Sequence, residues 1–66
     1  MKATINGRLR ELPDELTLAR LIELLGSAGK SVAVAQNDRV IRRTEYETQP
    51  VRDGDCLEII EAVAGG

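Results

Sequence analysis

The final residues of the chain, Gly65 and Gly66, place a carboxylate at the end of a segment with little side-chain bulk. No charged residue follows Glu61. A terminal carboxyl group has a pKa of about 3.5, so it is ionised at neutral pH and can attack an electrophilic phosphorus atom. Glycine has no Cβ, which lets the backbone enter a narrow channel or approach a phosphate closely. Two interpretations follow: the terminal carboxylate is the reacting group, or the tail is an inert chain end.

The sequence offers few residues for any other kind of catalysis. The chain has no histidine and one cysteine, Cys56, which leaves no histidine base, no multi-cysteine metal site and no internal disulfide. It also lacks a phosphate-binding loop, because Gly65-Gly66 has no helix after it. We therefore expect that the chain is not an enzyme, that it holds no metal or cofactor, and that another protein activates its carboxylate.

Composition excludes several classes of partner. The 66 residues include 9 Lys or Arg and 11 Asp or Glu, for a formal net charge of −2, and one tyrosine is the only aromatic residue. This balance argues against binding of nucleic acid through its phosphates or by base stacking. No apolar run approaches the roughly 18 residues of a membrane helix. A single cysteine is typical of a reducing compartment, so we expect a cytoplasmic domain that is monomeric when free.

Two residues near the end of the chain are further candidates. Strand alternation places Ile60 on the opposite face from Leu57 and Ile59. If a helix covers those two, Ile60 is exposed on the outer face of the sheet. It is then either an isolated surface residue or, with Val63 beside it, an anchor for a partner protein. Cys56 faces the same way, and we expect a small apolar residue there, with relay of a persulfide as the alternative.

Charged residues form two groups. One group is acidic and lacks the spacing of a calcium-binding loop, so we expect solvated side chains on a turn and a strand rather than a metal site. Its members are Asp53, Asp55, Glu58 and Glu61. The other is a small basic patch that we expect to aid solubility or docking of a partner. Its members are Arg39, Arg42 and Arg43. We expect Tyr46 to pack over an edge of the core.

The N-terminal half predicts a hairpin followed by a helix. Asn6-Gly7 lies within residues 2–12 and suits a type I′ turn, because both residues accept positive φ. Alternation leaves open whether Leu9 or Leu12 points into the core. After a loop at residues 13–15, Thr17 is a plausible N-cap and Gly26 fits the left-handed position after the helix. The helix has an apolar stripe with i, i+3, i+4, i+7 spacing. Its members are Leu18, Leu21, Ile22 and Leu25.

The C-terminal half predicts three strands, at residues 31–36, 39–42 and 56–63. The first two are joined by a turn at Asn37-Asp38, and the last is preceded by a turn at residues 52–55. One helical turn is expected at residues 45–47, and Pro50 excludes a central strand there. One helix and about five strands predict a two-layer α+β fold, a single domain over residues 1–66 with its tail at residues 63–66.

Taken together, these segments resemble the ThiS family of sulfur carriers over essentially the whole chain. The resemblance rests on the Asn6-Gly7 hairpin, the helix near residues 18–25, the strand and turn at residues 32–37, the turn at 52–55 and the tail at 62–66. It implies a β-grasp, ubiquitin-like fold with a mixed sheet, the first and last strands central and parallel, and a flexible diglycine tail.

The resemblance also implies a function in thiamine biosynthesis. A ThiF-type enzyme would use ATP and Mg²⁺ to adenylate Gly66. A persulfide formed by a cysteine desulfurase would then convert it to a thiocarboxylate, and the thiazole synthase ThiG would accept the sulfur. Gly65 would be the flexible neighbour, and Ala64 and Val63 would lie in the partner's channel. Ala64 stands where many such carriers have a third glycine.

Three alternatives remain from the sequence. The molybdopterin-synthase small subunit, of the MoaD type, also ends in two glycines, commonly after a proline-containing tail, whereas no proline follows Pro50 here. A ubiquitin-like modifier joined to lysines shares the same fold. A β-grasp binding module with an inert tail belongs to a different functional class.

Overall fold

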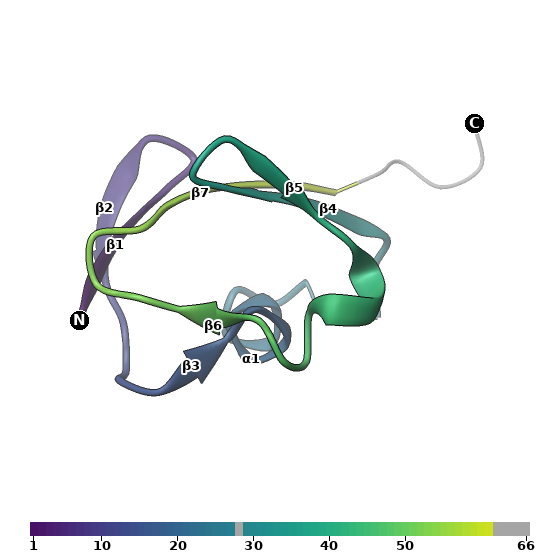
Figure 1. Cartoon of the computed structure of the whole chain (residues 1–66), viewed down its shortest axis with the longest axis horizontal. Coiled ribbons are helices and arrows are strands. Elements are labelled where there is room, and N and C mark those ends of the chain that lie inside the picture. The colour runs from purple at the N-terminus through teal and green to yellow at the C-terminus, as the bar shows by residue number, and fades with distance from the viewer. Residues whose placement is uncertain (28, 62–66) are drawn as a thin grey trace.

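A five-stranded sheet forms one layer of the molecule, and a helix with a two-stranded sheet forms the other (Figure 1). The computed structural model describes residues 1–27 and 29–61. The larger sheet has the order β2-β1-β7-β4-β5, and the smaller pairs β3 with β6. The bounds are β1 Lys2–Ile5, β2 Arg8–Glu11, β3 Leu16–Thr17, α1 Leu18–Leu24, β4 Val32–Gln36, β5 Arg39–Ile41, β6 Pro50–Val51 and β7 Cys56–Glu61.

The last strand, β7, lies at the centre of the larger sheet. It runs parallel to β1, with Thr4 opposite Cys56, and antiparallel to β4, with Val34 opposite Ile59. Leu57 on this strand is fully buried. The predicted two-layer α+β architecture and the central parallel pair of first and last strands are therefore confirmed, as is the β-grasp fold.

Two tight turns set the register of the outer hairpins. Asn6 and Gly7 have φ of 51° and 82°, and Asn37 and Asp38 have φ of 51° and 66°. Positive φ at both central positions is the geometry of a type I′ turn, whose twist matches that of the flanking strands. The first hairpin also settles the question left open by alternation, because Leu12 is buried.

The helix begins and ends as its sequence predicts. The Thr17 side chain accepts a hydrogen bond from the Arg20 N–H at 3.3 Å. At the other end, Gly26 has a φ of 79°, and its N–H donates to Glu23 O at 3.0 Å. The Ser27 N–H donates to Ile22 O, also at 3.0 Å. These two bonds form a Schellman motif, which satisfies carbonyl groups of the last turn.

The core fills the space between the two layers. Its largest fully buried side chains are Leu18 and Leu21 from α1 and Leu57 and Val34 from the sheet. Burial of a side chain of this size stabilises the fold by about 1.5–3 kcal/mol. Tyr46 is buried at the edge of the core, as predicted, and its hydroxyl donates to Val32 O at 3.1 Å.

Two short elements differ from the sequence analysis. The β3–β6 ladder was not predicted, because each strand has only two residues and gives no alternation to detect. Pro50 lies in β6 opposite Thr17, outside the larger sheet, so the exclusion of a central strand there is confirmed. The predicted helical turn at residues 45–47 is a 3₁₀ helix at Arg43–Glu45.

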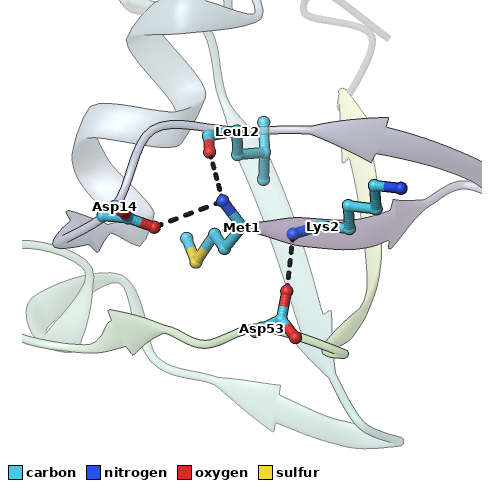
Figure 2. A network of polar contacts seen from close by, with 5 residues as sticks. All are labelled: Met1, Lys2, Leu12, Asp14 and Asp53. Atoms are coloured by element: carbon cyan, nitrogen blue, oxygen red, sulfur yellow. Dashed lines mark hydrogen bonds and ion pairs between the residues drawn. The ribbon is translucent and has the colours of Figure 1, made fainter.

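Polar contacts hold the start of the chain against the segment after β2 and against the turn that precedes β7 (Figure 2). The Met1 amino group donates to Leu12 O at 2.9 Å and to Asp14 Oδ1 at 3.2 Å. The Lys2 N–H donates to Asp53 Oδ1 at 2.7 Å, and the Gly54 N–H donates to Lys2 O at 2.7 Å. The two bonds of Lys2 hold the start of β1 beside the turn that leads into β7.

Candidate functional site

The candidate site begins where β7 ends, at Glu61. The predicted reacting residue Gly66 and its predicted neighbours Gly65, Ala64 and Val63 lie outside the described residues. Their assigned roles therefore stay predictions. The described part of the site is the end of β7, which fixes the point from which residues 62–66 follow.

The Glu61 carboxylate is held from both sides by the segment after α1. Ser27 Oγ donates to Glu61 Oε1 at 2.7 Å, and Lys30 Nζ lies 3.7 Å from Glu61 Oε2. Ser27 itself is buried. Along the sheet, Glu61 lies opposite Val32 of β4. The last described residue of β7 is thus tied both to the sheet and to the helical layer.

The side chain of Asn6 fixes β7 one position before Ile60. Its Nδ2 donates to Ile59 O at 3.1 Å, and its Oδ1 accepts from the Ile59 N–H at 2.8 Å. The amide group thereby continues the pairing of β7 beyond the end of β1. From the sequence alone, Asn6 is predicted only as a turn residue. The preference for Asn over Asp in an Asx-Gly turn was the only available signal, since Asn carries both a donor and an acceptor.

Ile60 is 62% exposed on the outer face of the sheet, as predicted. It lies opposite Ala33, and Val40 of β5, which is 78% exposed, lies opposite Ala35. Cross-strand partners share a face, so these four residues form one outer apolar strip. Small alanines between two exposed aliphatic side chains leave a shallow surface suited to protein contact. The role of Ile60 as a partner anchor stays a prediction.

The expectation that all four acidic residues are solvated is wrong for Asp55, which is buried. Its carboxylate accepts bonds from Gln36 Nε2 at 2.7 Å, Asn37 Nδ2 at 3.1 Å and the Arg52 N–H at 2.8 Å. Burial alone would raise the pKa of Asp55, but these hydrogen bonds and the Arg52 charge outweigh it and hold the pKa below its ordinary value of 3.8. Asp55 therefore organises the turn before β7.

The other three acidic residues, Asp53, Glu58 and Glu61, are exposed, as expected. Asp53 accepts a hydrogen bond from the Lys2 N–H, and Glu61 accepts one from Ser27 Oγ. Within residues 1–27 and 29–61, no group of three Asp, Glu, Cys or His side chains could hold a metal ion. Cys56 is a free, exposed thiol, as its alternation predicts. No helix in the same ranges is long and apolar enough to cross a membrane.

The predicted basic patch divides in two. Arg43 Nη2 donates to Ser31 Oγ at 3.0 Å. Arg39 and Arg42 instead line a cleft of about 630 Å³, together with Arg52. The sequence does not indicate that Arg52 belongs to this group, because Arg52 lies ten or more positions away and only the fold brings it beside β5.

The described residues hold the end of β7 in place through side-chain contacts. Glu61 is engaged with Ser27 and Lys30, Asn6 is engaged with the backbone of Ile59, and Ile60 is apolar. These contacts give a fixed base and an apolar surface beside it. A rigid base of this kind can direct a C-terminal segment toward the active site of another protein.

Comparison with known proteins gives matches over the whole chain. Residues 3–66 match the ThiS family. The sulfur carrier protein ThiS of Thermus thermophilus is 36% identical over 62 residues, which cover 94% of this chain and 95% of that protein. Thiazole synthases of Paramagnetospirillum magneticum and Magnetococcus marinus are 36% and 32% identical over 66 residues. The chain spans only 20% of the length of each of these synthases.

Solved structures show the same architecture. The crystal structure of the thiamine biosynthesis protein ThiS from Geobacter metallireducens has a TM-score of 0.85 and 29% sequence identity, with full coverage of both chains. The solution structure of a thiamine biosynthesis protein from the same organism has a TM-score of 0.83 and covers all of this chain and 88% of that one. The likeness therefore extends over both layers of the fold.

Proposed function

The chain belongs to the ThiS family, and we propose that it is a sulfur carrier protein of thiamine biosynthesis. Gly66 is the residue that carries the sulfur, and the β-grasp body is the part that partner enzymes grip. The observation that carries this proposal is the match to the sulfur carrier of Thermus thermophilus over 94% of this chain. The match also covers 95% of the Thermus thermophilus protein, so it spans nearly all of that carrier.

The proposed chemistry takes place at the Gly66 carboxylate. In the first step a carboxylate oxygen attacks the α-phosphorus of Mg-ATP on a ThiF-type enzyme, and pyrophosphate leaves. In the second step the terminal sulfur of a protein persulfide, formed by a cysteine desulfurase, attacks the Gly66 carbonyl carbon, and AMP leaves. A thiol then cleaves the S–S bond, which gives a disulfide and the Gly66 thiocarboxylate. This chain is the cosubstrate throughout, in the reducing cytoplasm.

A thiazole synthase of the ThiG type is the proposed acceptor. Two relatives named thiazole synthase contain a region similar to this whole chain within a protein about five times longer. Fusion of two sequences in one polypeptide favours a working partnership between the corresponding separate proteins. The molybdopterin, protein-modifier and inert-tail alternatives receive no support from these matches.

The outer apolar strip is the proposed docking surface for both partners. Ile60 directly precedes Glu61, so a protein that holds Ile60 lies next to the start of the tail. The small side chains of Ala33 and Ala35 leave the strip shallow between Ile60 and Val40. An enzyme resting on this surface could receive Gly65 and Gly66 in a channel, with Val63 and Ala64 at its entrance.

Mass spectrometry tests the proposal directly. The full chain is incubated with a ThiF-type enzyme, Mg-ATP, a cysteine desulfurase, cysteine and a reducing thiol. We expect a mass increase that corresponds to exchange of one oxygen for one sulfur, and none when ATP is omitted. A variant that lacks Gly66 is the matched control and should stay unchanged. Failure of the full chain to gain the mass, or equal loading of the shortened variant, would overturn the proposal.

A further inference from the structure

Three arginine side chains line one cleft at the β5 edge of the sheet. Arg39 lies in β5, Arg42 follows it directly, and Arg52 follows β6. The cleft has a volume of about 630 Å³ and also includes Val40 and Glu45 in its lining. Residues far apart in the sequence thus place three arginines around one cleft.

Arg39 and Arg42 form no ion pair within the described part of the molecule, and the Arg52 charge helps there to lower the pKa of Asp55 without forming one. The ion pairs found there join Met1 to Asp14, Arg20 to Glu23 and Lys30 to Glu61. Residues 1–27 and 29–61 offer no side-chain hydrogen bond or ion pair to the three guanidinium groups. Two carboxylates line the cleft: Glu45 is exposed, and Asp55 is buried with its bonds already committed. The exposed lining therefore has an excess of positive charge, in a chain whose formal net charge is −2.

The edge of β5 adds main-chain groups to this cleft. Gln36 and Arg39 close the two-residue turn as a pair, and Val40 is the next residue along, opposite Ala35. In an antiparallel ladder, pairs alternate between hydrogen-bonded and non-hydrogen-bonded, and the pair that closes a two-residue turn is hydrogen-bonded. The Val40 N–H and C=O therefore point away from β4, toward the open edge, where an extended segment can pair with them.

We propose that this cleft binds an extended, acidic segment of a partner protein. Carboxylates of that segment pair with Arg39, Arg42 and Arg52, and its backbone pairs with Val40. Because Val40 belongs to both the cleft and the outer apolar strip, the two surfaces form one continuous interface. The inference that the partner is an enzyme acting on the tail rests on the proposed function. The inference that its binding segment is acidic rests on the arginines of the cleft alone.

A peptide titration tests the cleft without any enzyme. The ¹⁵N-labelled full chain is titrated with a hexapeptide of alternating Glu and Val, and separately with its Lys-Val counterpart and with inorganic phosphate. We expect saturable shifts of the Arg39, Val40 and Arg42 amide signals with the Glu-Val peptide only. The R39E/R42E variant should lose these shifts. No saturable shift with the acidic peptide, or equal shifts with phosphate at equal concentration, would overturn the proposal.

Binding to the ThiF-type enzyme tests the biological partner. The R39E/R42E variant is compared with K2E/R20E, which makes the same change in net charge at residues of β1 and α1 that line neither the cleft nor the end of β7. Loss of two exposed charge pairs should weaken binding of R39E/R42E about tenfold. That variant should also lose most of the salt dependence, whereas K2E/R20E should bind like the unmodified chain. Melting temperatures check that both variants fold. Equal affinities of the two variants would overturn the proposal.

The two proposals fail in different ways. If the unmodified chain takes up no sulfur, the proposed function is wrong, and the peptide titration still decides the acidic cleft. If the unmodified chain takes up sulfur, and R39E/R42E binds the enzyme and takes up sulfur with the same dependence on enzyme concentration as the unmodified chain, the cleft is not part of the interface. At saturating enzyme, R39E/R42E should reach the same final extent of loading, because Gly66 is untouched.

Discussion

Ser27 Oγ donates a hydrogen bond to Glu61 Oε1 at 2.7 Å and so connects the end of the helical layer to the end of β7. Ser27 is the second residue after the helix cap Leu25, and its own N–H completes the Schellman motif. One buried residue therefore both closes α1 and holds the last described residue before the tail. The position of the strand end depends on how the helix terminates.

Replacement of Ser27 by alanine should lower the stability of the protein by about 1 kcal/mol, the typical net contribution of one such hydrogen bond. For a domain of this size the melting temperature should fall by about 4–8 °C. Thermal unfolding measures the change. Ser31→Ala is the control, because the Ser31 hydroxyl accepts a hydrogen bond from the exposed Arg43 side chain, and it should change the melting temperature little. Equal losses in both variants would contradict a special role for Ser27.

The Asn6 side chain should matter beyond the turn in which it lies. Asn6→Gly keeps the positive φ but removes both bonds to Ile59, so we expect a loss of about 2 kcal/mol. Asn6→Ala should cost about 1 kcal/mol more, because alanine tolerates this φ poorly. Urea denaturation measures both. Asp38→Gly is the control: Asp38 has a φ of 66°, and no side-chain hydrogen bond is found for it in the described residues, so stability should not fall.

The bonds to Asp55 predict the pH dependence of stability. Because the folded pKa is lowered from 3.8, the ionised side chain stabilises the fold above that value. This contribution is lost as the pH falls from about 4 through the lower folded pKa. The free energy of unfolding of the unmodified chain should therefore decline over this range more steeply than that of Asp55→Asn. Chemical denaturation at several pH values checks this, and parallel curves for both proteins would contradict it.

The exposed Ile60 side chain should affect partner binding more than folding. Ile60→Asp introduces a charge into the outer apolar strip, and we expect at least a tenfold loss of affinity for the ThiF-type enzyme, the effect of about 1.4 kcal/mol. The melting temperature should change little. Leu9→Asp is the matched control, because Leu9 is 68% exposed and lies on β2, outside the strip. Unchanged affinity of Ile60→Asp would remove this residue from the interface.

Much of the fold can be predicted because local signals agree with it. The Asn-Gly pair, the Thr17 cap, the apolar stripe of α1 and Gly26 all specify backbone geometry within a few residues. The β3–β6 ladder escapes prediction, because two-residue strands carry no periodicity. The burial of Asp55 also escapes it. Its three partners come from β4, the Asn37 turn and the backbone of Arg52, and only the folded chain brings them together.

The candidate site divides in the same way. Exposure of Ile60 follows from simple alternation along β7, and the glycine tail is visible in the sequence itself. The bonds from Asn6 and Ser27 to β7 are not visible, because they join positions separated by 53 and 34 residues. For the same reason the arginine cleft appeared in the sequence only as a basic run beside β5.

The position of β7 has a consequence for how the protein is made. The strand that completes the centre of the larger sheet follows every other described strand in the sequence, and it joins the β1–β2 hairpin to the β4–β5 hairpin. A polypeptide whose synthesis stops before residue 56 cannot close the sheet, so its apolar residues stay accessible to proteases. Unfinished copies should be degraded, and they would not compete with complete ones for the same enzymes.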